Sequence, residues 1–285
     1  MVGKYYLDYN QIPEKICDNN IDIIAIGHMG CFRFLPNVKS LIKIFERIKK
    51  NNKILRLYTP RIPQEHLVDF KNYLITLSKT VNEDNFQLVI NDIGILIWLK
   101  KSNIIFRHLV LGSTISWSAM QNTLFDNIMR AESESLKNIY MQVNNNSILR
   151  IDFFKQLGIR EIEVPNICEV LNHVEKIKLK DIRISVFEKY MLAGYSRVCM
   201  NMKVQNKESR FCKKECSEII KIDMDKMWDY NSGKFPYFVK APNVSKLYSD
   251  IYVFGNIQFR IIPEQIRGKI EQLSEKDTVL QIVEI

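Results

Sequence analysis

The sequence lacks any apolar run that approaches the roughly 20 residues needed to span a bilayer. Its first 20 residues, MVGKYYLDYNQIPEKICDNN, contain no apolar h-region and are polar from residue 8 onward, so we expect no signal peptide. These absences predict a cytoplasmic protein with no membrane partner. Disulfides are rare in the cytoplasm, so clustered cysteines there point to metal binding or catalysis.

The common catalytic signatures are also missing. The sequence contains no Ser-His-Asp signature, P-loop or H-E-x-x-H, and no G-x-G-x-x-G follows an expected strand. A protease would need an activated nucleophile beside a base, and none is visible. His66, His108 and His173 show no ligand spacing, and we expect them to be structural or exposed. There is no internal repeat and no low-complexity linker.

What is present is a basic chain of ordinary globular composition. Of its 285 residues, 46% are hydrophobic and 26% are charged, enough for one large core or two modest ones. The net charge is +9, from 41 basic and 32 acidic residues. This excess suggests an anionic partner such as nucleic acid, an acidic protein or a metabolite. The alternative is that the lysines solvate helix faces such as LIKIFERIKKNNK; no RNA-binding motif is present.

Short β-rich runs alternate with amphipathic helical segments. Strands are expected at 21–27, 53–59, 86–92, 108–113, 159–165 and 181–190, and helices at 37–52, 64–80, 93–101, 148–158 and 168–180. Further β-rich runs follow at 237–244, 250–255 and 258–263, and a helix is expected at 263–276. Roughly eight βα units in series predict the α/β class and a closed, TIM-like (β/α) barrel, a single domain over residues 1–285. An open doubly wound sheet is the alternative.

Two segments interrupt this alternation. Residues 117–146 add helical material between the fourth expected strand and the next helix, and residues 200–235 form an insertion that carries cysteines. Chemistry in such barrels lies at the C-terminal ends of the strands. We therefore expect both insertions to cover the site.

Four of the six cysteines follow the ends of expected strands. Cys31 comes just after the first expected strand, Cys199 lies at or past a late strand, and Cys212 and Cys216 follow at spacings C-x12-C-x3-C. First and late strands are neighbours in a closed barrel, so the four thiols are expected to converge on one face. Four thiols without histidine fit tetrahedral zinc or an iron–sulfur cluster. Only Cys212 and Cys216 form a close pair in the sequence, and this spacing favours an iron–sulfur cluster over zinc. Disulfides and unligated buried cysteines are the alternatives.

The segments DIIAIGHMGC, LVINDIGIL, HLVLGS, DFFKQLGIREIEVP and ISVFEKYMLAGYSRVC, together with the C-x3-C pair, resemble peptidase family U32. The resemblance is to its short, single-domain iron–sulfur members of ubiquinone biosynthesis, and it covers about residues 5–262. It implies a barrel in which Cys31, Cys199, Cys212 and Cys216 hold a 4Fe–4S cluster. It also implies oxygen-independent hydroxylation, of a ubiquinone precursor in one branch and of RNA bases in others. Despite the family name, it does not imply proteolysis.

The chain also departs from the family pattern. Members often carry a His-Gly pair before the YS-x-x-C segment, where this chain has Glu188 and Lys189. This change lies near the expected pocket, so the family's substrate is not carried over. Cys17 and Cys168 match no ligand position. Cys168 is expected to lie on a helix and to pack in the hydrophobic core.

Four further residues are candidates for substrate contact: His28, Asp92, Glu188 and Tyr195. His28 lies three residues before Cys31, and Tyr195 opens the YSRVC segment. Asp92, beside Asn91, ends the third expected strand, where it could move a proton or simply cap the next helix. Glu188, like Glu163, projects from a late strand. A cluster with four cysteine ligands has no open iron, so substrate contact would fall to these groups.

Several functions remain open at this stage. The first is an iron–sulfur hydroxylase-type enzyme acting on a small molecule or a carrier-bound group. The second is a non-catalytic subunit paired with a second U32-like chain. RNA modification is the third, and a cluster with a non-cysteine ligand or an extra sulfide would favour sulfur transfer.

Overall fold

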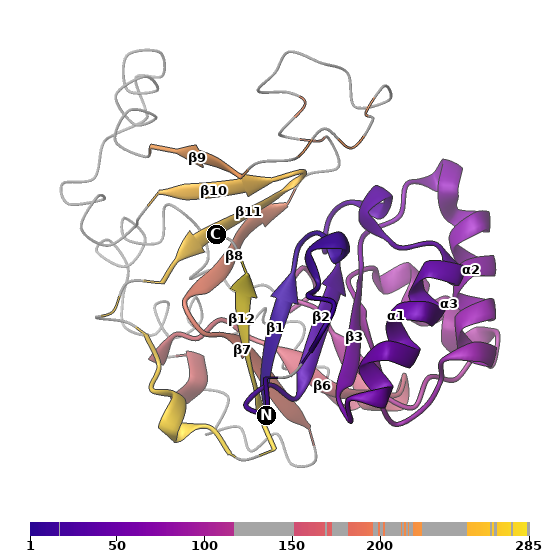
Figure 1. Ribbon diagram of the computed structural model, residues 1–285, viewed down its shortest axis with the longest axis horizontal. Coiled ribbons are helices and arrows are strands. Elements are labelled where there is room, and N and C mark those ends of the chain that lie inside the picture. The colour runs from indigo at the N-terminus through magenta and orange to yellow at the C-terminus, as the bar shows by residue number, and fades with distance from the viewer. Residues whose placement is uncertain are drawn as a thin grey trace.

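Eight parallel strands form a closed barrel in the computed structural model (Figure 1). The structure describes residues 1–16, 18–116, 151–168, 170–172, 182–195, 199, 202, 212, 214, 216, 219–223, 250–262, 264, 267–274 and 276–283. The barrel strands are β1 (Val2–Tyr6), β2 (Ile23–Gly27), β3 (Ile54–Thr59), β4 (Phe86–Ile90), β5 (Leu109–Leu111), β6 (Ile159–Glu163), β7 (Arg183–Phe187) and β12 (Thr278–Val283). Their order around the barrel is β1-β12-β7-β6-β5-β4-β3-β2. The predicted closed barrel is confirmed.

Helices cover the outside of this barrel. They are α1 (Val38–Lys50), α2 (Leu67–Thr80), α3 (Ile93–Lys101) and α7 (Ile151–Gln156), with short 3-10 helices η1 (Tyr9–Gln11), η2 (Phe32–Phe34), η3 (Gln64–His66) and η7 (Ile270–Gln272). Helix α1 begins where the side chain of Asn37 accepts the N–H of Ser40, the usual role of an N-cap. Helix α7 ends before Gly158, whose φ is +93°, a value that favours glycine. Both helices lie within the expected ranges 37–52 and 148–158.

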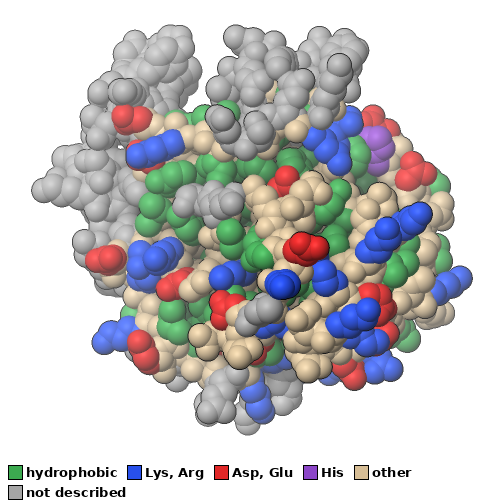
Figure 2. Space-filling model, in the orientation of Figure 1, with side chains coloured by type: hydrophobic (Ala, Val, Ile, Leu, Met, Phe, Trp, Pro, Cys, Tyr) green, Lys and Arg blue, Asp and Glu red, His purple; other side chains and the backbone are tan. Residues whose placement is uncertain are grey.

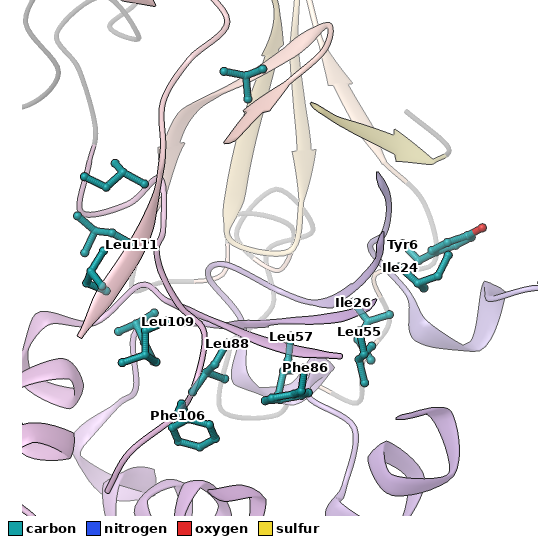
Figure 3. Close-up of a cluster of buried hydrophobic side chains, with 14 of the residues drawn as sticks. Tyr6, Ile24, Ile26, Leu55, Leu57, Phe86, Leu88, Phe106, Leu109 and Leu111 are labelled. Atoms are coloured by element: carbon teal, nitrogen blue, oxygen red, sulfur yellow. The ribbon is translucent and has the colours of Figure 1, made fainter. Parts of the chain in front are cut away.

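The hydrophobic core lies between the barrel and its helices. Leu55 and Leu57 of β3 and Leu88 of β4 are fully buried and point from the strands toward the helices (Figure 3). Strand side chains alternate between two faces, so the intervening residues point into the barrel. There Tyr5 stacks on Tyr58 with ring centroids 4.4 Å apart.

A buried polar layer also occupies the barrel interior. The Arg56 guanidinium lies 2.6 Å from the Glu161 carboxylate, donates to Gln87 at 2.7 Å and donates to Ser185 at 3.0 Å. Arg183 approaches the other Glu161 oxygen at 3.5 Å. Both side chains of the Arg56–Glu161 pair are completely buried, a state that is tolerated when hydrogen bonds satisfy the charges.

A second, antiparallel sheet lies at the end of the barrel toward which the arrows of β1, β2 and β12 point (Figure 1). It contains β8 (Tyr190–Tyr195), β9 (Ile220–Ile222), β10 (Ile251–Phe254) and β11 (Ile257–Ile261), in the order β8-β11-β10-β9. Strand β8 leaves the C-terminal end of β7 through Glu188 and Lys189. The N–H of Glu188 donates to Leu280 of β12 at 2.8 Å, which fixes the start of this sheet at the rim.

The predicted strand membership of the barrel was wrong in part. The first and last barrel strands, β1 and β12, lie outside the expected runs, whereas the runs 250–255 and 258–263 belong to the antiparallel sheet. The physical reason is the two-residue link Gly255–Asn256, because parallel neighbours need a crossover of about a dozen residues. The helix expected at 263–276 was also wrong: its described residues contain 3-10 structure at Glu264 and in η7, and an isolated bridge from Arg267 to Ile167, but no α-helix.

The structure describes only a small part of the two expected insertions. Residues 117–146 and the run 237–244 lie outside the described residues. Of 200–235 the structure describes residues 202, 212, 214, 216 and 219–223, which include β9. Among the described residues, no helix has the length and apolar character needed to cross a bilayer.

Candidate functional site

The four predicted ligand cysteines come from separate segments at the end of the barrel that carries the small sheet. Cys31 follows β2 and precedes η2, and Cys199 lies shortly after β8. Cys212 and Cys216 precede β9. Cys216 is buried in an apolar cluster that includes Phe34, Phe254 and Ile257, and Cys31 and Cys199 pack against this cluster.

Electrostatic interactions connect all four thiols. Burial raises the pKa of Cys31 to about 11, with smaller increases from Cys199 and Cys212, while the backbone N–H groups of Arg33 and Phe34 oppose the shift. For Cys216 the pKa is raised first by a hydrogen bond with Cys199, then by burial, and then by the charges of Cys199, Cys212 and Cys31. Thiols that disfavour one another's ionisation in this way lie close together.

The imidazole of His28 fixes the backbone that carries Cys31. Its Nδ1 accepts the N–H groups of Gly30 at 3.1 Å and of Cys31 at 2.9 Å, so the ring proton resides on Nε2. Nε2 then donates to the carbonyl oxygen of Phe254 at 3.2 Å. Burial lowers the pKa of His28 to about 3, so the ring stays neutral. The side chain is fully buried, and the geometry gives it a positioning role.

The turn between β10 and β11 packs directly on this loop. The Nδ2 of Asn256 donates to the carbonyl oxygen of Gly30, and a Cβ on Gly30 would lie 2.5 Å from Asn256 Oδ1. A Cβ on Gly255 would lie 3.3 Å from His28 Nε2. Two glycines thus allow loop and turn to meet.

The thiols converge through the antiparallel sheet. The prediction that they meet because the first and a late barrel strand are neighbours was wrong. Cys31 follows the second barrel strand, and Cys199 follows no barrel strand.

Asp92 caps a helix. Its Oδ1 accepts the N–H groups of Gly94 at 2.8 Å and Ile95 at 3.2 Å, and its Oδ2 accepts the N–H of Ile62 at 3.3 Å. The capping alternative considered from the sequence is therefore what the structure shows. Neighbouring Asn91 is buried and donates to Thr59 at 3.0 Å, so it holds strand ends together.

Glu188 and Tyr195 lie at the two ends of β8. The Glu188 side chain is half-buried and makes no hydrogen bond or ion pair within the described part of the chain. The guanidinium of Arg61, which follows β3, lies over the Tyr195 ring at 4.4 Å from its centroid. Of the four candidates for substrate contact, Glu188 and Tyr195 keep a carboxylate and a hydroxyl group that make no hydrogen bond among the described residues.

A buried acid, Glu163, lies at the C-terminal end of β6, and its role was not predicted from the sequence. Glu163 ends β6; its Oε2 accepts the backbone N–H of Ser113 at 2.9 Å and the Ser113 hydroxyl at 2.7 Å, while Tyr58 donates to Oε1. Burial raises the pKa of Glu163. The signal was present in REIEV, where alternation places Glu161 and Glu163 on the same, inward face. The Glu163 carboxylate is therefore buried at the end of β6 with Tyr58 and Ser113 as its donors.

The spacing of the thiols bears on what they could hold. Among the described residues, no group of three or more His, Cys, Asp or Glu is arranged to hold a metal ion. Zinc thiolate bonds of about 2.3 Å would bring four sulfurs to within roughly 4 Å of one another. A four-iron cluster is larger than one ion and holds its cysteine sulfurs further apart than a single zinc ion does.

Cys168 lies apart from this group. Cys168 is partly exposed in a helical segment, contrary to its expected place in the core, and its sulfur accepts from Asn172 at 3.6 Å. Cys17 lies outside the described residues.

Comparison with models of protein families, with curated proteins and with solved structures gave no match to this chain.

Proposed function

We propose that Cys31, Cys199, Cys212 and Cys216 hold one 4Fe–4S cluster and that the chain is an iron–sulfur redox protein of the U32 type. The observation that carries the proposal is the convergence of the four thiols, which interact electrostatically and of which three pack in one apolar cluster. A reducing compartment such as the cytoplasm keeps such thiols available for a cluster.

The surroundings of the thiols suit an iron–sulfur centre. The donor set is entirely thiol, because both nitrogens of nearby His28 are engaged with backbone groups. Phe34 and Phe254 line the apolar cluster around the buried Cys216. Low solvent exposure and backbone N–H groups near the sulfurs set the potential of such a centre, and the N–H groups of Arg33 and Phe34 are placed near Cys31. When bound, the cluster supplies one-electron transfer.

The reaction type rests on the resemblance to family U32, which supports an oxygen-independent hydroxylase-type enzyme. Its substrate would be a small molecule or a carrier-bound group near the rim. There Arg61 stacked on Tyr195 offers a cation and an aromatic face, and the Glu188 carboxylate stands half-buried on the same turn as the start of β8.

A non-catalytic subunit is the second candidate function, and one observation favours it. Two of the four groups expected to contact substrate, His28 and Asp92, are occupied by backbone groups: N–H groups for both, and the Phe254 carbonyl oxygen for His28. In this case the cluster would serve a second U32-like chain in a heterodimer. RNA modification has weaker support: on the face in Figure 2, basic and acidic side chains are interspersed and no broad basic patch is visible.

The deciding experiment is anaerobic purification followed by absorption and EPR spectroscopy, with iron and sulfide analysis. We expect a brown protein with about four iron and four sulfide per chain. A colourless protein loaded with zinc would contradict the proposal. Co-expression with a second U32-like chain then separates the two candidates: turnover by this chain alone supports the enzyme, and turnover that appears only in a stable heterodimer supports the subunit.

A further inference from the structure

A polar cavity lies at the opposite end of the barrel, away from the cysteines. It has a volume of about 760 Å³ and is lined by Asp84, Arg107, His108, Arg160, Ile182, Arg183, Ser274, Lys276 and Asp277. These residues precede or begin β4, β5, β6, β7 and β12, and the five strands are consecutive neighbours around the barrel. The cavity therefore follows the N-terminal rim of half the barrel, and the proposed function above makes no use of it.

Positive charge dominates the lining of this cavity. Four arginine and lysine side chains face two aspartates. Asp84 is already paired, with Arg107 at 3.0 Å. The Asp277 carboxylate accepts the N–H of Ile184 at 3.0 Å and both the N–H and the hydroxyl of Ser274 at 2.9 Å. The acids in the lining are thus occupied by donors of the fold.

Two of the cations are left for a ligand. Arg160 and Lys276 are exposed and form no ion pair with any residue that the structure describes. Below them Glu161 lies between two guanidinium groups, Arg56 at 2.6 Å and Arg183 at 3.5 Å, so the barrel interior does not neutralise the cavity. His108 also lines the cavity; its pKa is lowered by burial and by Arg183, and Asp84 and Glu161 oppose this shift.

From this arrangement we infer that the cavity is a binding site for a small phosphate-bearing anion, with Arg160 and Lys276 as the principal cationic contacts. Guanidinium groups match phosphate in a bidentate manner and ammonium groups act as point charges. The volume falls within the range of about 300–1,000 Å³ typical of small-ligand sites. Ile182 is the one aliphatic side chain in the lining, which suits a multiply charged ligand better than an apolar one.

The test uses the anaerobically purified chain with its cluster and measures pyrophosphate and ATP binding by titration calorimetry at low salt. The double variant Arg160→Gln/Lys276→Gln removes two exposed cations from the cavity. Its control, Lys39→Gln/Lys101→Gln, removes the same charge from exposed helix positions outside the lining. We expect the cavity variant to weaken binding about tenfold or more, the equivalent of about 1.4 kcal/mol, and the control to bind as the wild type does.

Three outcomes would overturn the inference. One is no binding of either anion, and another is equal weakening in both double variants, which would indicate a general effect of net charge. The third uses a short single-stranded RNA: if RNA binds and the cavity variant loses it while pyrophosphate and ATP do not bind, the surface recognises a nucleic-acid backbone. Loss of the cluster in the cysteine variants should leave anion binding unchanged, so this inference and the proposed function fail independently.

Discussion

The backbone nitrogen of Cys31 donates to the Nδ1 atom of His28 at 2.9 Å, while the other nitrogen of that ring reaches Phe254 across the small sheet. One buried side chain therefore joins the loop after β2 to the strand β10. It does so without being a ligand itself. We therefore expect the iron content of the proposed cluster to depend on His28, although His28 need not contact the substrate.

Replacing His28 with alanine is expected to reduce iron content although all four cysteines remain. The backbone N–H groups of Gly30 and Cys31 and the carbonyl of Phe254 would lose their partner, and each buried group left alone costs about 1–3 kcal/mol. Iron per chain and the urea midpoint measure the effect. His66→Ala is the control, because that histidine lies on the outside of the barrel and contacts Phe32. Full iron content and unchanged stability in His28→Ala would refute the positioning role.

Single serine substitutions at Cys31, Cys199, Cys212 and Cys216 are each expected to lose or degrade the cluster. Serine retains the size of cysteine but replaces the thiolate that binds iron. Cys168→Ser should retain the full absorption spectrum, because Cys168 contacts Asn172 and lies outside the thiol group. Iron and sulfide analysis of the five proteins makes the comparison. An intact cluster in any of the first four variants would remove that cysteine from the ligand set.

Glu188→Gln should lower turnover strongly, whereas Asp92→Asn should have little effect. The Glu188 side chain stands free of partners among the described residues. Asp92 accepts backbone N–H groups, and asparagine can keep the cap on Gly94 and Ile95 while losing only the 3.3 Å contact with Ile62. Both variants should keep the cluster spectrum. Activity with the substrate, by this chain alone or with its partner, is the measurement. A large rate loss in Asp92→Asn with unchanged stability would reverse the assignment, and wild-type rates in Glu188→Gln would remove that carboxylate from the mechanism.

Arg56→Met is expected to destabilise the barrel by about 3–5 kcal/mol, since it leaves the Glu161 carboxylate buried without its nearest cation. In the double variant Arg56→Met/Glu161→Gln the loss should be smaller than in Arg56→Met alone. Arg183 is 30% exposed, so water can solvate it once Glu161 is neutral. Urea unfolding of the single and double variants tests the coupling. Strictly additive losses would show that the pair contributes through packing alone.

The pH dependence of stability should carry a contribution from Glu163. Burial raises its pKa above the ordinary value of 4.5, so the folded state binds this proton more tightly than the unfolded state does. Its stabilising contribution is complete below about pH 4.5 and is lost as the pH rises through the raised, folded-state pKa. The stability of wild type relative to Glu163→Gln should therefore decrease from pH 5 to pH 8. Urea midpoints of both proteins across this range provide the measurement, and a constant difference would contradict the shift.

Local patterns predict much of the first half of the chain. Leu41, Phe45 and Ile48 define the buried face of α1, Asn37 marks its start, and Gly158 marks the end of α7. The parallel strands β2 to β7 follow from their apolar runs. These elements are readable because their burial and their caps depend on residues a few positions apart.

The sequence by itself determined the kind of barrel; it also predicts a set of four ligand cysteines with no histidine at ligand spacing. Only the tertiary structure decided which strands close the barrel, because β1 pairs with β12 across almost the whole chain. It also decided that the thiols come together at the hairpin of β10 and β11. The side chains of His28 and Asp92 bind backbone groups, which no local pattern required. The reason is physical: hydrogen bonds between residues such as His28 and Phe254 join segments more than 200 positions apart, and no local spacing encodes them.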